Sequence, residues 1–198
     1  SNSFITESSG NSETHNDGHN LSLELEYKID SKTTLSLVPK LSKNNSLAEE
    51  NSESSSSNNL GLINRSNSSK EDDRSSTNFS NNLYLMRSFK KKGRSLGITF
   101  NNTNKENDAS IINKSETYFF QDPSMPDDIR NQREMNNVKE NTYYARVGYL
   151  EPLVDSLSLN LRIAHEWKDY ANNKTTFNYN TGSQNYSDIN SLLSYDIE

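Results

Sequence analysis

The sequence predicts an all-β fold of antiparallel, up-and-down strands, on three observations. Apolar and polar residues alternate in short runs, so each run has one apolar and one polar side when it is extended. The runs fall into pairs joined by short turn segments, as in hairpins. Long tracts rich in Ser and Asn separate these pairs, and each of the two residue types supplies about thirty of the 198 residues.

The first expected hairpin covers residues 20–42. Its first arm, NLSLELEYKI, places Leu, Tyr and Ile on one side and Ser, Glu and Lys on the other. A turn is expected at residues 30–32, after which the alternation continues to Leu41. Pro39 has no N–H to donate, which predicts a bulge or the end of regular pairing at this position.

Two further hairpins are expected over residues 77–103 and 139–169, joined by the basic turn 90–94 and by the turn 151–155 respectively. The run SLGITF alternates cleanly, whereas the arm that precedes it carries apolar residues on both sides and leaves its inner and outer faces unassigned. In the last hairpin each arm has one apolar side. These sides consist of Tyr143, Ala145, Val147 and Tyr149 in the first arm, and of Leu157, Leu159, Leu161, Ile163 and Trp167 in the second.

The connecting tracts 43–76, 104–137 and 171–190 contain too few apolar residues to build a core, and we expect them to be long polar loops. Very short and very long connections would then alternate along the chain. This alternation is unusual in compact soluble domains and is typical of outer-membrane barrels, which have tight turns on the inner side and long loops outside.

Composition excludes several function classes. The chain has no Cys, which rules out disulfides, thiolate metal sites and a Cys nucleophile. Its net charge of −6 without a dense basic stripe argues against binding of nucleic acid. No run reaches the length of about 18 apolar residues that a membrane-spanning helix needs.

Two architectures fit the alternating runs. In a transmembrane β-barrel the apolar sides face lipid and the charged sides, with Glu24, Glu26 and Lys28, face a watery lumen. In a soluble β-sandwich the same apolar sides would form a core between two sheets. We favour the barrel because Tyr27 and Tyr149 lie near the short turns and Tyr143 and Trp167 near the long tracts, where membrane-interface aromatics belong.

Three stretches resemble one known family. These are HNLSLELEYKIDSKTTLSL, NFSNNLYLMRSFKKKGRSLGITF and YYARVGYLEPL. Together they are similar in order and spacing to the outer-membrane β-barrel proteins of Bacteroidetes, a family related to TonB-dependent receptors. The resemblance covers residues 19–198 and implies that residues 1–198 are one partial barrel within a larger protein.

The resemblance also implies partners and a location. It implies a receptor-like transporter at the cell surface, embedded in outer-membrane lipid, with extracellular loops. The remaining barrel strands and a plug domain would belong to the parent chain, and a TonB-type energy-coupling protein and a surface lipoprotein are implied as partners. The alternative function is that of a secreted or surface-attached β-sandwich, either an adhesin or a glycan-binding module.

The chemical inventory indicates no enzyme. No nucleophile elbow, phosphate loop or dinucleotide fingerprint is present, so we predict no catalytic residues and no cofactor. His15 and His19 have a spacing that suits a metal only on a helix, and a turn is expected between them, so no metal site is predicted.

Aromatic residues in the polar tracts are the candidates for ligand contact, because aromatic rings stack on sugars and peptides. They are Tyr118, Phe119, Phe120, Tyr179 and Tyr186. Strands that rise beyond the membrane would account for the same residues without any ligand.

Overall fold

The computed structural model describes residues 4–197, which form one antiparallel sheet. Its strands are β1 (Ile5–Ser22), β2 (Leu25–Asp30), β3 (Thr33–Asn58), β4 (Gly61–Ser88), β5 (Ser95–Phe119), β6 (Asp128–Val154), β7 (Leu157–Asn180), β8 (Asn185–Ile189) and β9 (Tyr195–Ile197). The order across the sheet is β1-β3-β4-β5-β6-β7-β8, with β2 beside β3 and β9 beside β7. The expected all-β, up-and-down fold is confirmed.

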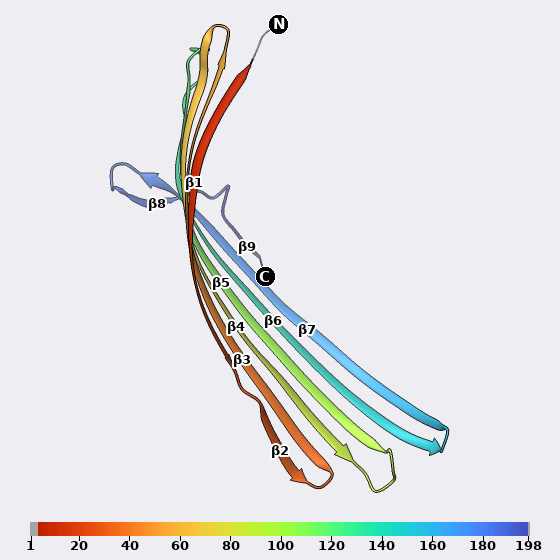
Figure 1. Cartoon of the computed structure of the whole chain (residues 1–198). Coiled ribbons are helices and arrows are strands. Elements are labelled where there is room, and N and C mark those ends of the chain that lie inside the picture. The colour runs from red at the N-terminus through yellow and green to blue at the C-terminus, as the bar shows by residue number, and fades with distance from the viewer. Residues whose placement is uncertain (1–3, 198) are drawn as a thin grey trace.

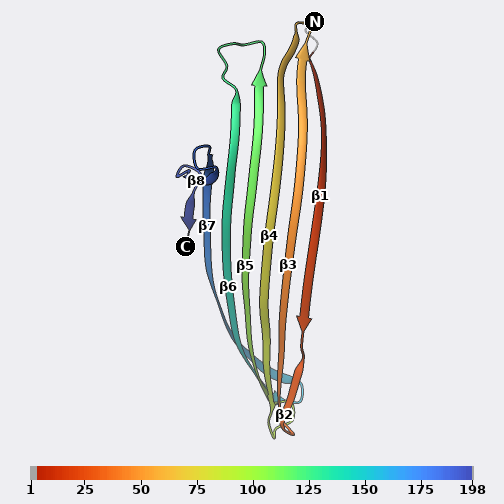
Figure 2. The same ribbon diagram turned by 90° about the vertical axis from the view of Figure 1, so that its left-hand side faces the viewer.

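The sheet is a single twisted, curved layer whose two edges do not meet (Figure 1). The turns β2–β3, β4–β5 and β6–β7 lie together at one end, which we call the turn end (Figure 1). The turns β3–β4 and β5–β6 lie at the opposite end, the tip (Figure 2). Strand β8 folds out to the side of the layer at the end of β7 (Figure 1).

The polar tracts 43–76, 104–137 and 171–190 are a correction to the sequence prediction, because most of their residues are paired strand rather than loop. β3 and β4 continue through the first tract and leave only Asn59 and Leu60 between them. β5 and β6 leave residues 120–127, and β7 and β8 leave residues 181–184. The long loops that the sequence suggested are therefore long polar extensions of the strands, and the connections between the strands are short.

Polar side chains support these extensions from strand to strand. The hydroxyls of Ser52 and Ser68 lie 2.7 Å apart, and those of Ser66 and Thr117 lie 3.0 Å apart. The ammonium of Lys139 lies 2.9 Å from the Glu106 carboxylate. Backbone pairing does not require apolar side chains, and a strand with two polar faces has no period-two hydrophobic pattern. The pattern therefore marks only the apolar part of each strand.

Pro39 lies where the neighbouring edge strand is interrupted. β1 ends at Ser22 and β2 begins at Leu25, while β3 continues through this position and pairs Pro39 with Asn81. The Leu23 N–H donates to the Pro39 carbonyl at 3.0 Å. Because Pro39 has no N–H to donate back to the edge strand, the pairing of β3 with that strand is interrupted here. The pairing of β3 with β4 continues. The expected irregularity thus lies in the partner strand.

The described part of the chain has no buried apolar core. The only buried side chains among these residues are polar: Thr33, Ser56, Asp72, Thr99 and Thr176. Ordinary domains bury an apolar face between at least two layers. In this single layer both faces are open, so the position of the apolar residues on those faces decides what the sheet can contact.

Candidate functional site

An apolar belt crosses one face of the sheet near the turn end. Residues directly opposite each other in an antiparallel ladder point to the same face, so the register defines rows across the strands. The first complete row consists of Tyr27, Leu35, Leu85, Ile98, Val147 and Ile163. The next row consists of Leu25, Leu37, Leu83, Phe100, Ala145 and His165. We call the face that carries these rows the belt face.

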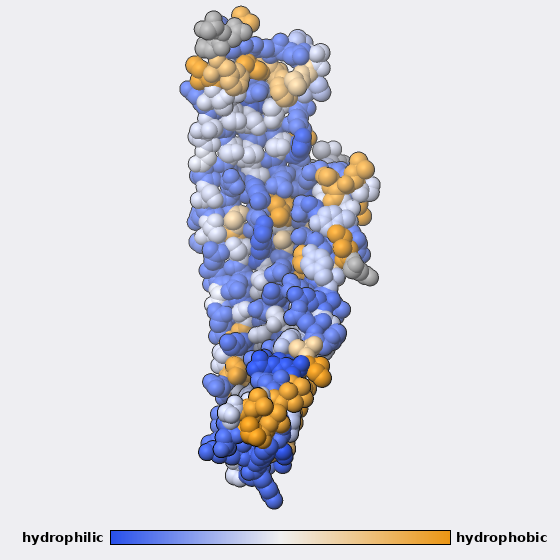
Figure 3. All heavy atoms as spheres, turned by 90° about the vertical axis from the view of Figure 1, so that its right-hand side faces the viewer, coloured by the Kyte–Doolittle hydropathy of each residue, from blue (hydrophilic) through white to orange (hydrophobic). Residues whose placement is uncertain are grey.

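The belt continues less completely for further rows in both directions, where Asn81, Asn102, Arg87 and Glu151 interrupt it. Toward the tip it includes Leu21, Leu23, Pro39, Leu41, Phe79, Tyr143 and Trp167, and toward the turn end Leu96, Tyr149, Leu157, Leu159 and Leu161. Many of these side chains are strongly exposed, with Ile163 at 77%. Hydrophobic residues gather toward the turn end and again at the tip, and the middle of the layer is mainly hydrophilic (Figure 3).

The opposite face is polar over the same strands. The row behind the belt consists of Glu26, Ser36, Tyr84, Thr99, Arg146 and Ala164, and its neighbour of Lys28, Thr34, Met86, Gly97, Gly148 and Arg162. Charges on this face also form ion pairs, such as Lys168 with Glu166 at 3.3 Å. We call this side the charged face.

The predicted interface aromatics all lie on the belt face. Tyr143 and Trp167 stack with ring centroids 5.7 Å apart at the tip side of the belt, and His165 stacks on Trp167 at 5.4 Å. Tyr149 packs edge-on against Phe89 at 6.3 Å at the turn end. Tyr27 lies one row further into the belt than Tyr149 and is 65% exposed. Aromatic pairs therefore occur at both margins of the belt.

A charge cluster lies at the turn-end margin of the belt, where Glu151 pairs with Leu159. The Glu151 carboxylate accepts hydrogen bonds from Lys91 Nζ at 2.8 Å, from Arg94 Nε and Nη2 at 2.7 and 2.8 Å, and from the Tyr149 hydroxyl at 2.7 Å. These donors, the Arg94 guanidinium first, lower the pKa of Glu151 to about 2. The cluster ties the β4–β5 turn to β6.

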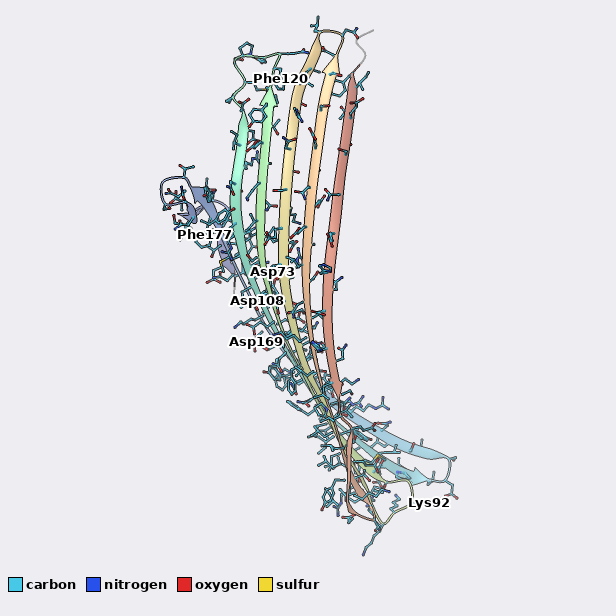
Figure 4. The ribbon with its side chains drawn as sticks, turned by 60° about the vertical axis from the view of Figure 1, so that its left-hand side comes forward. Asp73, Lys92, Asp108, Phe120, Asp169 and Phe177 are labelled. Carbon is cyan, nitrogen blue, oxygen red and sulfur yellow. The ribbon has the colours of Figure 1, made fainter. Side chains whose placement is uncertain are left out.

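Sequence reasoning assigned Glu151 to a turn and missed this cluster. The four side chains come from segments about sixty positions apart, and only the pairing of β5 with β6 brings them together. Lys92 lies on the same turn at the far end of the sheet from Phe120 (Figure 4).

The first group of ligand-contact candidates lies at the tip. Tyr118 and Phe119 end β5, and the Phe120 N–H donates to the Ile63 carbonyl at 2.9 Å. The Tyr118 hydroxyl donates to Glu116 at 2.9 Å, and this bond raises the pKa of Tyr118. The carbonyl contact of Phe120 continues the pairing of β4 with β5 one residue past the end of β5, which is a structural role.

The second group forms a separate pair. Tyr179 and Tyr186 meet edge to face at 5.2 Å across the β7–β8 hairpin. The Tyr186 hydroxyl donates to Asn131 at 2.7 Å, and partial burial raises the pKa of Tyr186. Asn131 pairs with Lys114 on β5. Lys114 lies four residues before Tyr118, so about 14 Å along β5 separates Tyr118 from the position of Asn131. The five candidates therefore form two groups and not one site.

The two histidines considered for a metal lie in β1, where a turn was expected. Four residues of strand separate His15 from His19 by about 13 Å, too far to share one ion. No cluster of three or more potential metal-ligating His, Asp or Glu side chains occurs within residues 4–197.

The acidic run at Glu71–Asp73 is partly neutralised, because Arg74 donates to both oxygens of Asp72 at 2.6 and 2.8 Å and lowers its pKa.

Comparisons with known proteins identify no relative. No protein-family model matches the chain, and no curated protein matches its sequence. Within the described residues no helix is long and apolar enough to cross a membrane. The surfaces described above are therefore the basis for a functional assignment.

Proposed function

We propose that this chain forms part of the wall of a β-barrel in a bacterial outer membrane, as a non-catalytic segment of a TonB-dependent receptor-like transporter that binds or takes up a nutrient. One observation carries the proposal: an apolar belt crosses six paired strands on one face, and polar and charged rows lie directly behind it. A barrel wall needs this combination, since one face contacts lipid and the other contacts water.

On β7, where the belt is wide, its width suits a bilayer. On β7 it extends from Leu157 to Trp167, eleven residues or about 34 Å of extended chain. At a strand tilt of about 35–45° this length covers about 24–28 Å, close to the apolar band of about 25 Å around outer-membrane barrels. β7 itself has 24 residues, so its other half extends beyond the band as polar strand.

The belt is also oblique to the strands. On β3 it covers Leu35–Leu41, centred on Val38, and the register leads from Val38 across four strand pairings to Glu166 on β7. The belt on β7 is centred on Arg162, four residues away. A displacement of about 14 Å along the strand over about 19 Å across the sheet gives an inclination of about 35°. Strands of transmembrane barrels tilt by about 35–45° from the membrane normal.

A soluble β-sandwich fits less well. It needs a second sheet to cover the apolar side chains of the first. The described strands all belong to one sheet, and no apolar side chain among them is buried. Lipid would cover the belt without a second sheet, and we therefore prefer the barrel to the adhesin or glycan-binding module.

The rest of the proposal depends on the resemblance to the Bacteroidetes family. The open edges of the sheet would pair with further strands of the parent barrel, whose lumen would hold a plug domain. The polar tip would project outside the cell, where a surface lipoprotein would meet it, and a TonB-type protein would supply energy from the inner side.

Heat-modifiability of the full-length parent protein tests this proposal. Membranes are extracted in detergent, and boiled and unboiled samples are compared on a gel. We expect a shift in migration on boiling, because a closed barrel resists detergent until it is heated. A protein that is extracted without detergent and shows no shift would rule the barrel out.

A further inference from the structure

A hollow lies on the charged face directly behind the belt, near the turn end. It has a volume of about 270 Å³, and its lining includes Tyr84, Gly97, Thr99, Arg146, Gly148 and Arg162. Its floor is the pair Gly97 and Gly148, which lie opposite each other on β5 and β6. Because neither residue has a side chain, the backbone is left uncovered and a depression results.

Larger side chains border this floor on two sides. The Tyr84 ring and hydroxyl lie over Gly97, where an added Cβ would meet the hydroxyl oxygen at 3.4 Å. The Arg162 stem lies beside Gly148, where an added Cβ would be 4.0 Å from Cγ. Arg146 and Arg162 are diagonal neighbours on β6 and β7, since Arg146 pairs with Ala164 and Gly148 with Arg162. Diagonal neighbours lie within reach of one ligand when their side chains are long.

Neither guanidinium has a carboxylate partner within the described residues. Arg146 donates to the Thr99 hydroxyl at 3.3 Å, and Arg162 takes part in none of the hydrogen bonds or ion pairs found there. The lining of the hollow contains no Asp or Glu. The nearest carboxylate on β7, Glu166, pairs with Lys168 at 3.3 Å. Two positive charges therefore face the same small space without counter-charge.

We propose that this hollow binds the anionic group of a small solute, a carboxylate or a phosphate, between Arg146 and Arg162. Guanidinium groups suit such anions because their N–H donors match two oxygens at once. The volume is just below that of typical pockets for small organic ligands, about 300–1,000 Å³, so one anionic group fits and a folded segment does not.

The inference rests on the proposed function, because it is the barrel model that makes the charged face a lumen wall. An open hollow on one wall holds its ligand loosely. Weak sites suit a passage, since a solute has to leave each site as well as enter it. The hollow would then serve as one step for anionic solutes moving along the wall.

Chemical footprinting of the full-length parent protein in detergent micelles tests the site without any transport assay. Phenylglyoxal modifies accessible arginines, and mass spectrometry reports each position. Succinate and inorganic phosphate are the probes, with chloride at equal ionic strength as the control. Because only unoccupied sites react, modification of Arg146 and Arg162 is expected to slow about tenfold at a concentration about ten times the dissociation constant.

Two matched comparisons decide the outcome. Arg130, which pairs with Asp128 at 2.7 Å far from the hollow, is expected to react at an unchanged rate. The Gly148→Val variant keeps both arginines and fills the floor, and we expect it to lose the protection. Val suits a strand, and circular dichroism of this variant checks that the sheet is kept.

Equal protection of Arg130, no protection at all, or full protection in Gly148→Val would each overturn the site. Protection by a Glu-rich peptide but not by succinate or phosphate would also overturn it, because the occupant would then be a polypeptide. Protection in a protein that shows no heat shift would retain the anion site and remove the barrel. A heat shift without protection would retain the barrel and remove the anion site.

Discussion

Arg94 holds Glu151 through two parallel hydrogen bonds, from Nε to one carboxylate oxygen at 2.7 Å and from Nη2 to the other at 2.8 Å. This bidentate contact joins the β4–β5 turn to β6 at the margin of the belt. Glu151 is the more enclosed partner, with 16% of its side chain exposed against 36% for Arg94. Such geometry is the strong form of a surface ion pair.

The pH dependence of the turn end follows from this contact. The pKa of Glu151 lies at about 2 in the folded chain against an ordinary 4.5. A lowered pKa stabilises the fold above the ordinary value, and this stabilisation is lost as the pH falls from about 4.5 to about 2. The protection factors of the amides at residues 90–94, which correct for the intrinsic pH dependence of exchange, should therefore fall over that range. In Glu151→Gln these protection factors should be several-fold lower at neutral pH, and they should not change between pH 4.5 and about pH 2.

Asp155→Asn is the matched control for this prediction. Asp155 lies in the neighbouring β6–β7 turn and takes part in none of the ion pairs found in the described part of the chain. Its variant should keep the pH dependence of residues 90–94. If the two variants behaved alike, the contact between Arg94 and Glu151 would not control the turn.

A charge placed on the belt should destabilise the protein in a bilayer. For Ile163→Arg, at the middle of the belt, we expect a loss of about 2–4 kcal/mol in the free energy of unfolding from lipid vesicles. Ala164→Glu places a charge on the charged face of the same strand, opposite Arg146, and should cost less than about 1 kcal/mol. Urea titration of both variants measures the difference, and equal costs would contradict a lipid-facing belt.

The stacked rings of Tyr143 and Trp167 should be energetically coupled. Aromatic pairs contribute about 0.5–1.5 kcal/mol beyond their buried area. A double-mutant cycle with Tyr143→Ala and Trp167→Ala should give a coupling energy in this range. The pair Tyr170 and Trp167 on the same strand makes no ring contact within the described residues, and a cycle on it should give a coupling near zero.

The polar tracts should be protected from hydrogen exchange as strands are. Amides of residues 44–57 and 62–76 pair with each other in the β3–β4 ladder. We expect these amides to exchange more slowly than those of the β5–β6 connection at 120–127, which lie outside any strand. Exchange at equal rates in the two regions would contradict the extended ladder.

The sequence predicted the part of the fold in which side chains alternate in polarity. The arms with Leu21 to Ile29 and Leu157 to Trp167 show their strand character directly, because one face differs chemically from the other. Ser52 and Ser68 share a rung of the same sheet, but their surroundings are polar on both faces and give no periodic pattern. Loop and polar strand look alike in such tracts.

In the candidate site, too, the sequence predicted the features that depend on one strand and missed those that depend on the pairing of two strands. Tyr143, Tyr149 and Trp167 were predicted on the apolar side from spacing within single strands, and they lie there. The hollow between Arg146 and Arg162 depends on Gly97 of β5 lying opposite Gly148 of β6. Register between strands fixes that pairing, and no local pattern in either strand reveals it.

The most direct test of the lipid-facing belt is a spin-label scan along β7 in proteoliposomes. The chain has no Cys, so single cysteines at positions 161 to 166 can be labelled without background. We predict that labels at positions 161, 163 and 165 collide mainly with oxygen, which concentrates in lipid, and those at 162, 164 and 166 with a water-soluble nickel complex. Equal access of the nickel complex to all six positions would contradict the belt as a membrane-facing surface.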